Sequence, residues 1–435
     1  MKKYMGKALA VLLALMMLLL CFAGCSSKGE TMMKLESETL SVNLFELYLS
    51  RMKGALASSY SYGSKALTDS FWDTVMSTDG TTYNTYYTNQ VLESAKTYLA
   101  ALYAFEQRGM ELPKETEDAI EEKLKKMIEE DAEGSKSQFN SILSQYGVNY
   151  NILKEAHMID AKITYLKNSM YGANGGLIAE NLIEEYYQRT YARFKQVFLY
   201  TYDYVYYTDG DGEAIYFKKD GKTIAYDTAA TPKTDATGKA VLDANGDQIY
   251  VNEDGTIAYD KKNGERKNKT EEDGSVLVED LTGERLQEVL DQALQIEAKV
   301  QEDNFTGFDD LVEKYSLDVG MEKYPNGYYL TADTNYDSPE VVEKLFTLEV
   351  GEWATVRSDY GVHIIMRYEN EKEAYDMKEY EDFFISNTTG TYVFMEDLKN
   401  FLLSEYLEQF KANIVIDTTV LAQIDIKRAS ANFYY

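Results

Sequence analysis

Apolar residues recur three or four positions apart in several separate parts of the chain. This spacing runs through residues 40–172, where glycines and prolines mark the stops, and it predicts a series of amphipathic helices. It returns at 286–300, 308–315 and 394–410. Residues 194–199 and 361–366 instead have the composition of strands buried in a sheet. Together these patterns predict an α+β fold with more than one domain.

Residues 200–283 follow a different pattern. Asp-Gly or Asn-Gly pairs separate short runs rich in Tyr, Ile and Val, at 209–212, 220–221, 245–246, 254–255 and 263–264. Such pairs favour tight turns, so we predict a β-meander of successive hairpins inserted into the surrounding domain. A calcium loop is the alternative, because Asp243, Asn245 and Asp247 alternate like the start of an EF-hand. Since Gln248 and Asp254 stand where that loop needs Gly and Glu, we predict no metal site.

The charge balance restricts the possible partners. The chain of 435 residues has 44 basic and 73 acidic side chains, which gives a formal net charge of −29. Such a charge repels nucleic acid and anionic lipid surfaces. Tyrosine is also frequent, with 38 Tyr against 2 Trp. No core can supply partners for so many phenol hydroxyls, so we expect many of these rings to be partly exposed. Their number reflects either a habit of composition in the lineage or a surface that binds unfolded chains.

The first 25 residues have the layout of an export signal. Three lysines precede an apolar run at 8–20 that is short for a membrane span, and small residues precede Cys25. Ala-Gly-Cys resembles the bacterial lipobox, although Phe22 replaces its usual Leu. The resemblance implies that Cys25 is acylated and anchors the protein to the outer face of the bacterial cell membrane.

Four motifs between residues 308 and 367 occur in a recognisable order. They read FDDLVEKYSLD (308–318), PNGYYL (325–330), KLFTLEVGEWATV (344–356) and GVHIIMR (361–367). Their order and spacing resemble the parvulin family of peptidyl-prolyl isomerases. The resemblance implies an FKBP-like βα fold whose first strand is 194–199, with the hairpin insertion placed directly after that strand.

The same resemblance implies a set of catalytic residues. Asp318 takes the position of the acidic or cysteine group near the substrate carbonyl, His363 that of the strand-borne histidine, and Ser358 that of the hydroxyl before the final strand. The family's other histidine is absent, and Val197 is predicted at its position. No cofactor is implied, because prolyl isomerisation only rotates an amide bond and breaks none.

The proline ring of a substrate needs an apolar cup. By resemblance Phe346 is its aromatic floor, and Val341 and Val342 lie near the positions of the other cup side chains. For His363 and Asp318 purely structural roles also stay open, as a hydrogen-bonded core imidazole and as a loop carboxylate.

The helical region before the parvulin motifs resembles the chaperone domain of SurA and PrsA foldases over roughly 91–170. The sequence thus predicts a signal peptide (1–24), a tether (25–32), a helical chaperone domain (33–192), a parvulin-like domain (193–370, insertion 200–283) and a C-terminal segment that packs back on the chaperone domain (371–435).

Three functions fit these features. The first is a lipid-anchored extracytoplasmic foldase with isomerase activity, whose partners are exported or unfolded polypeptides. The second is a chaperone that binds without catalysis, as the missing histidine suggests. The third is a surface lipoprotein that binds a glycan or a protein through the Tyr-rich insertion.

Overall fold

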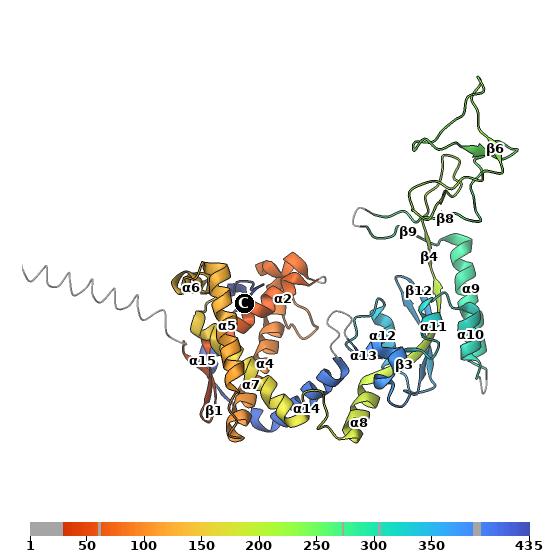
Figure 1. Cartoon of the computed structure of the whole chain (residues 1–435). Coiled ribbons are helices and arrows are strands. Elements are labelled where there is room, and N and C mark those ends of the chain that lie inside the picture. Colours follow the sequence, from red (N-terminus) through yellow and green to blue (C-terminus); the bar gives the residue numbers. More distant parts are fainter. Residues whose placement is uncertain (1–28, 60–61, 272–273, 303–305, 386–392) are drawn as a thin grey trace, which may run out of the picture. The chain divides into compact units, whose positions relative to one another are not determined.

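The computed structural model describes residues 29–59, 62–271, 274–302, 306–385 and 393–435 (Figure 1). The predicted signal peptide, Cys25 and the first part of the tether lie outside these residues. None of the helices in the described ranges is long and apolar enough to cross a membrane. The structure combines helices with antiparallel sheets, which confirms the predicted α+β class. The chain divides into two compact units, unit 1 (Met1–Ile183 with Gly390–Tyr435) and unit 2 (Glu184–Thr389).

Unit 1 is mainly helical. Its helices are α2 (Val42–Ser58), α3 (Asp69–Asp73), α4 (Tyr83–Gln107), α5 (Lys114–Ala132), α6 (Lys136–Ser144), α7 (Tyr150–Tyr171), α14 (Val393–Lys411) and α15 (Thr418–Leu421), with short 3-10 turns at Gly63–Leu67 and Ile426–Arg428. A small antiparallel sheet has the order β13 (Val415–Ile416), β1 (Thr31–Leu35), β2 (Glu38–Ser41). The hydroxyl of Ser41 caps α2 by accepting from the amide of Leu44 at 3.3 Å.

The last part of the chain is built into the core of unit 1. Leu403 and Leu407 of α14 pack with alanines of α4 and with Leu166 of α7. Strand β13 pairs with β1, so that Ile416 lies opposite Met33. The core of this unit therefore joins segments that are far apart in the sequence.

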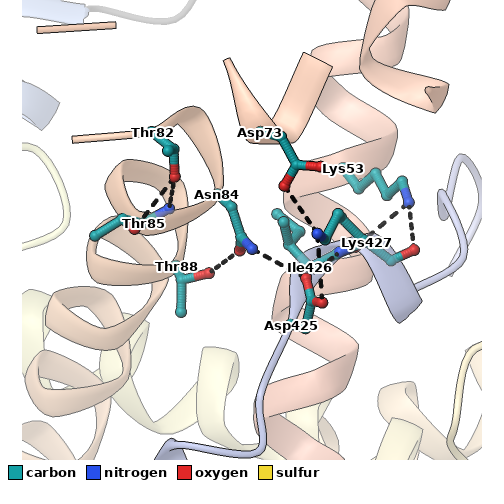
Figure 2. A network of polar contacts seen from close by, with 9 residues as sticks. All are labelled: Lys53, Asp73, Thr82, Asn84, Thr85, Thr88, Asp425, Ile426 and Lys427. Carbon is teal, nitrogen blue, oxygen red and sulfur yellow. Dashed lines mark hydrogen bonds and ion pairs between the residues drawn. The ribbon is translucent and has the colours of Figure 1, made fainter. Parts of the chain in front are cut away.

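A buried lysine holds the chain beyond α15 in place. The Nζ of Lys53 on α2 donates to the carbonyl oxygens of Ile426, Lys427 and Ala429 at 3.3, 3.1 and 2.8 Å. Figure 2 shows the bonds of Lys53 to Ile426 and Lys427, and it also shows Asn84, which donates to Asp425 at 3.0 Å. Burial lowers the pKa of Lys53, and the carbonyl dipoles replace the water that the ammonium group loses.

Gly54 offers a sharp test of this packing. A Cβ at this position would lie 2.0 Å from the carbonyl oxygen of Asn432, which is buried against α2. In a free helix Gly→Ala stabilises by roughly 0.5–1 kcal/mol, but here overpacking dominates, and we expect Gly54→Ala to lower the free energy of unfolding by about 1–3 kcal/mol. Urea unfolding measures this change. Gly176→Ala is the control, because its Cβ meets no atom within 4 Å. Equal stability of the two variants contradicts the prediction.

Unit 2 is organised around a four-stranded antiparallel sheet. Its order is β10 (Tyr328–Thr331), β3 (Tyr191–Tyr200), β12 (Gly361–Tyr368), β11 (Trp353–Ser358). Its helices are α9 (Gly283–Val300), α10 (Phe308–Tyr315), α11 (Gly320–Lys323), α12 (Pro339–Leu345) and α13 (Glu381–Phe384), with 3-10 turns at Ala374–Asp376 and Lys378–Tyr380. Helix α8 (Glu180–Thr190) crosses the boundary between the two units and leads into β3.

The two faces of this sheet bury different cores. On one face, Val197 and Leu199 of β3 and Ile364 of β12 pack against α9 and α10. On the other face, Phe194 and Ile365 pack against α12, together with its Val341, Val342 and Leu345. Successive side chains of a strand point to opposite faces, so β3 contributes to both cores in alternation.

The insertion differs from the predicted meander. Local hairpins do form across the Asp-Gly and Asn-Gly turns, for example between Thr208 and Ala214 and between Leu242 and Gln248. The strands, however, pair in a nested order: β4 (Tyr202–Tyr204) with β9 (Val278–Asp280), β5 (Tyr216–Phe217) with β8 (Glu265–Arg266), and β6 (Thr231–Pro232) with β7 (Tyr250–Val251). The segment is a stem of distant pairs that carries small hairpins, because each turn closes only its own few residues.

Asp243 has a structural role in this insertion. Its Oδ1 accepts from the amides of Asn245 and Asp247 at 2.9 Å each, and its Oδ2 accepts from the hydroxyl of Tyr226 at 3.1 Å. An Asp side chain that bonds to the backbone two residues on is a turn-forming element. The alternation that resembles an EF-hand is thus used to close a tight turn.

Candidate functional site

The site is built on the cleft face of β3, which we define as the face that carries Gln196 and Phe198. Gln196 is 2% exposed, and His363 of β12 lies beside both residues on the same face, opposite Phe198 in the strand register. Val197 points the other way, into the core under α9. The prediction that Val197 occupies the position of the missing histidine is therefore one residue off, and Gln196 is the side chain that faces His363.

The loop after α10 brings Asp318 to this face. Strand β10 pairs with β3 only as far as Phe194, which leaves the next part of the β3 edge open. The hydroxyl of Ser316 fills it, accepting from the amide of Phe198 and donating to the carbonyl of Gln196, both at 3.1 Å. The amide of Leu317 then donates to the carbonyl of Phe198 at 2.8 Å. Two residues after Ser316, Asp318 reaches the side chain of Gln196.

Four side chains form a continuous hydrogen-bonded chain. Gln196 Nε2 donates to Asp318 Oδ2 at 2.6 Å, and Gln196 Oε1 lies 2.9 Å from His363 Nδ1. His363 Nε2 lies 2.8 Å from the hydroxyl of Ser358. The structure therefore brings together the three predicted residues Asp318, His363 and Ser358, and Gln196 connects them.

The donors in this chain can be assigned. A carboxylate only accepts, so Gln196 must turn its amide group to Asp318 and its oxygen to His363. The Nδ1 of His363 then carries the proton, and Nε2 accepts from Ser358. Burial lowers the pKa of His363 to about 4, although the charge of Asp318 acts in the opposite direction. His363 is thus a neutral ring at physiological pH.

The low pKa of His363 predicts how the fold responds to acid. Below the unfolded value of about 6.5 the unfolded chain binds a proton that the folded site refuses. The contribution of neutral His363 to stability is therefore complete above pH 6.5 and falls as the pH drops toward 4, by roughly 2 kcal/mol at pH 5. We expect the NMR shift of its Hε1 proton to stay constant from pH 8 to 5.5. A titration near pH 6.5 contradicts the assignment.

Beside this chain lies a cleft of about 340 Å³. His363 and Asp318 line it, and its aromatic walls are Phe198, Tyr200, Tyr202, Tyr336 and Tyr360. Phe198 stacks on the imidazole of His363 with ring centroids 4.4 Å apart. The hydroxyl of Tyr336 accepts from Gln196 Nε2 at 3.1 Å, and burial raises its pKa, so it keeps its own proton.

The predicted proline cup has a different location in the structure. Val341 and Val342 are buried in the core of α12, and Phe346 packs against the same core. None of the three lines the cleft. The apolar surface next to His363 comes from β3, from the loop before α12 and from the turn at Tyr360. The alternation of Phe194, Gln196 and Phe198 was the sequence signal for part of this wall, and Tyr336 had no signal.

The described residues contain no group of three or more His, Cys, Asp or Glu side chains that could hold a metal ion. The cleft is lined by aromatic rings, a neutral imidazole and the carboxylates of Asp318 and Asp337. Such a site has the shape and the polar groups to enclose an apolar ring and to hydrogen-bond to a peptide group.

Comparisons with known proteins give matches only at the level of structure. No family model matches the sequence, and no curated protein matches it. The fold is similar to the crystal structure of PrsA from Bacillus subtilis, with 15% identity over 80% of this chain and 91% of that chain and a TM-score of 0.19. It is also similar to the peptidylprolyl isomerase PrsA from Bacillus anthracis (13% identity, 75% of this chain, 99% of that chain, TM-score 0.23) and to the foldase PrsA from Streptococcus pneumoniae (12%, 81%, 90%, 0.19). At this level of similarity, a function can be inferred only from the side chains of the cleft.

Proposed function

We propose that the protein is an extracytoplasmic foldase whose unit 2 catalyses the cis-trans isomerisation of Xaa-Pro bonds in exported polypeptides. The observation that carries the proposal is the hydrogen-bonded chain from Asp318 through Gln196 and His363 to Ser358, placed along the wall of an aromatic cleft. The helical unit 1 would hold unfolded segments of the same clients.

Prolyl isomerisation breaks no covalent bond, so the protein only has to lower a rotational barrier. Rotation about a peptide bond has a barrier of about 18–20 kcal/mol because twisting removes amide resonance. A dry cleft that holds the proline ring, with hydrogen-bond donors matched to the twisted amide, lowers that barrier. The aromatic walls provide the enclosure. Tyr336, which accepts from Gln196 and keeps its proton, is the donor that we assign to the bound peptide.

NMR exchange spectroscopy on a proline-containing tetrapeptide tests this function. We expect the full chain to increase the cis-trans exchange rate, and Tyr336→Phe to reduce the increase by up to about tenfold, since a lost hydrogen bond contributes roughly 0.5–1.5 kcal/mol. Tyr165→Phe, a change at an exposed tyrosine of unit 1, is the matched control. An exchange rate equal to that of the free peptide removes the catalytic function.

A chaperone that binds without catalysis is the second candidate. One observation favours it. Gln196 is hydrogen-bonded both to Nδ1 of His363 and to the carboxylate of Asp318, and unlike a histidine it cannot transfer a proton between them. Binding of the tetrapeptide with no change in its exchange rate, together with suppression of client aggregation, would support this candidate over the first.

The proposal places the protein at the outer face of the cell membrane through an acylated Cys25. It is supported by the charged start, the apolar run and the Ala-Gly-Cys motif of the sequence. Cells fed labelled palmitate should incorporate the label into the wild-type chain and not into Cys25→Ser, and the variant should leave the membrane fraction. Unchanged labelling of Cys25→Ser contradicts the anchor.

A further inference from the structure

An aromatic stripe leaves the cleft along the strand that enters the insertion. Phe198, Tyr200, Tyr202 and Tyr204 occupy every second position, so they share the cleft face as β3 continues into β4. Their rings form a continuous row, with successive centroids 4.7, 4.9 and 5.5 Å apart. The row begins at the ring stacked on His363 and ends at the base of the insertion.

Hydrogen bonds and an ion pair connect the base of the insertion, which carries the stripe, to neighbouring segments of unit 2. Thr201, the single residue between β3 and β4, donates its amide to the carbonyl of Tyr360 at 3.3 Å and accepts from the amide of Leu281 at 2.8 Å. Arg285, at the start of α9, forms an ion pair with Asp203 of β4. These bonds hold the direction of the stripe relative to the cleft.

A second hollow of about 600 Å³ lies along this stripe. Tyr200 and Tyr202 line both it and the cleft, so the two hollows adjoin at these rings. Its other walls include Tyr204, Tyr206 and the half-exposed Leu317, which places further apolar surface beyond the proline position.

The lining of the hollow carries a net positive charge. Arg266 lies over the ring of Tyr206 at 4.4 Å, whereas Arg285 is neutralised by Asp203. The charged residues that line the hollow are Arg266, Arg285 and Asp203, which leaves a net charge of +1 (2 − 1) in a chain whose net charge is −29.

We propose that the tyrosine stripe extends the cleft into a groove for an extended polypeptide segment, which holds apolar or aromatic client residues beyond the Xaa-Pro bond and an acidic residue near Arg266. This inference rests on the proposed function, because the cleft has to receive the Xaa-Pro bond. Tyrosine rings also suit a glycan, but the shared rings favour one chain that runs from the cleft into the groove. Aromatic stacking and burial of apolar side chains supply the affinity, and the charge sets the preferred direction.

Fluorescence anisotropy with the full chain tests the groove. The probes are a labelled proline tetrapeptide and two longer peptides that add Phe-Ala-Phe-Glu to its N-terminal or to its C-terminal end. We expect one of the longer probes to bind about fivefold to tenfold more tightly than the tetrapeptide, and we expect replacement of its Glu by Lys to remove part of that gain. Tyr204→Ala should abolish most of the gain. Tyr204→Phe should retain it, because stacking needs the ring and not the hydroxyl.

The matched control is Tyr207→Ala. Tyr207 is 37% exposed and Tyr204 is 38% exposed, but Tyr207 does not line the hollow. Equal affinity of wild type for short and long probes overturns the inference, as does a gain that persists in Tyr204→Ala. Binding of a soluble cell-wall oligosaccharide without any peptide gain also overturns it and identifies a glycan surface. If the peptide gain is present but exchange is not catalysed, the groove stands and the isomerase function fails.

Discussion

Asp318→Ala is expected to reduce catalysed exchange by about a hundredfold, which corresponds to roughly 2.7 kcal/mol of transition-state stabilisation. The carboxylate accepts from Gln196 at 2.6 Å, from the hydroxyl of Tyr328 at 2.9 Å and from the amide of Gly320 at 2.9 Å. Without it, Gln196 loses the contact that fixes the orientation of its amide, and His363 loses its fixed acceptor. NMR exchange on the tetrapeptide measures the effect.

The same change is expected to destabilise unit 2. Tyr328 is buried, and a Cβ on Gly320 would meet its hydroxyl at 1.9 Å, so the packing around this carboxylate is tight. Buried donors left without an acceptor cost about 1–3 kcal/mol each. Asp333→Ala, at an exposed turn of the same unit, is the control. A folded Asp318→Ala chain that exchanges the peptide at the wild-type rate would falsify the assigned role.

Gln196→Leu is expected to abolish catalysis and to lower the free energy of unfolding by roughly 2–4 kcal/mol. Leucine has a similar volume but leaves the Nδ1 proton of buried His363 without an acceptor and removes the Gln196 donor from Asp318, which keeps Tyr328 and the amide of Gly320 as donors. Urea unfolding and the exchange assay together measure the two effects. If Gln196→Leu is as stable and active as wild type, the hydrogen-bonded chain has no role.

Gln196→His is the variant to compare with Gln196→Leu. A histidine at this position can accept from His363 and donate to Asp318, so we expect it to keep the fold and to catalyse exchange at least as well as Gln196 does. It also adds a group that titrates near neutral pH. Exchange by the variant should therefore change between pH 5.5 and 8, whereas wild-type exchange should stay constant, since His363 keeps its neutral form throughout this range.

Several elements of the fold could be predicted from the sequence. The helix at 308–315, the strand at 361–366 and the turns at Asp-Gly and Asn-Gly pairs depend on local spacing and local turn chemistry, and each has its predicted type in the structure. Asp318, Ser358 and His363 were also found from their motifs, and the structure brings them into one chain. Their roles in catalysis stay a prediction.

The errors concern the register of one strand and the location of the cleft. A strand has a period of two, so a shift of one residue exchanges its faces; this is why Val197 was chosen and Gln196 was missed. Val341, Val342 and Phe346 have the apolar character of a cup, but apolar character alone does not distinguish a cleft wall from a core. The packing of α12 on the sheet decides that they belong to the core.

The sequence by itself determined the elements, the turn positions and three polar residues of the site, because these follow from interactions between near neighbours. Only the tertiary structure decided that Gln196 connects Asp318 to His363, which are separated from it by more than a hundred residues. It also decided that the insertion is a nested stem whose first strand, β4, continues the row of aromatic rings on β3. Contacts between distant segments set both results, and no local pattern in the chain records them.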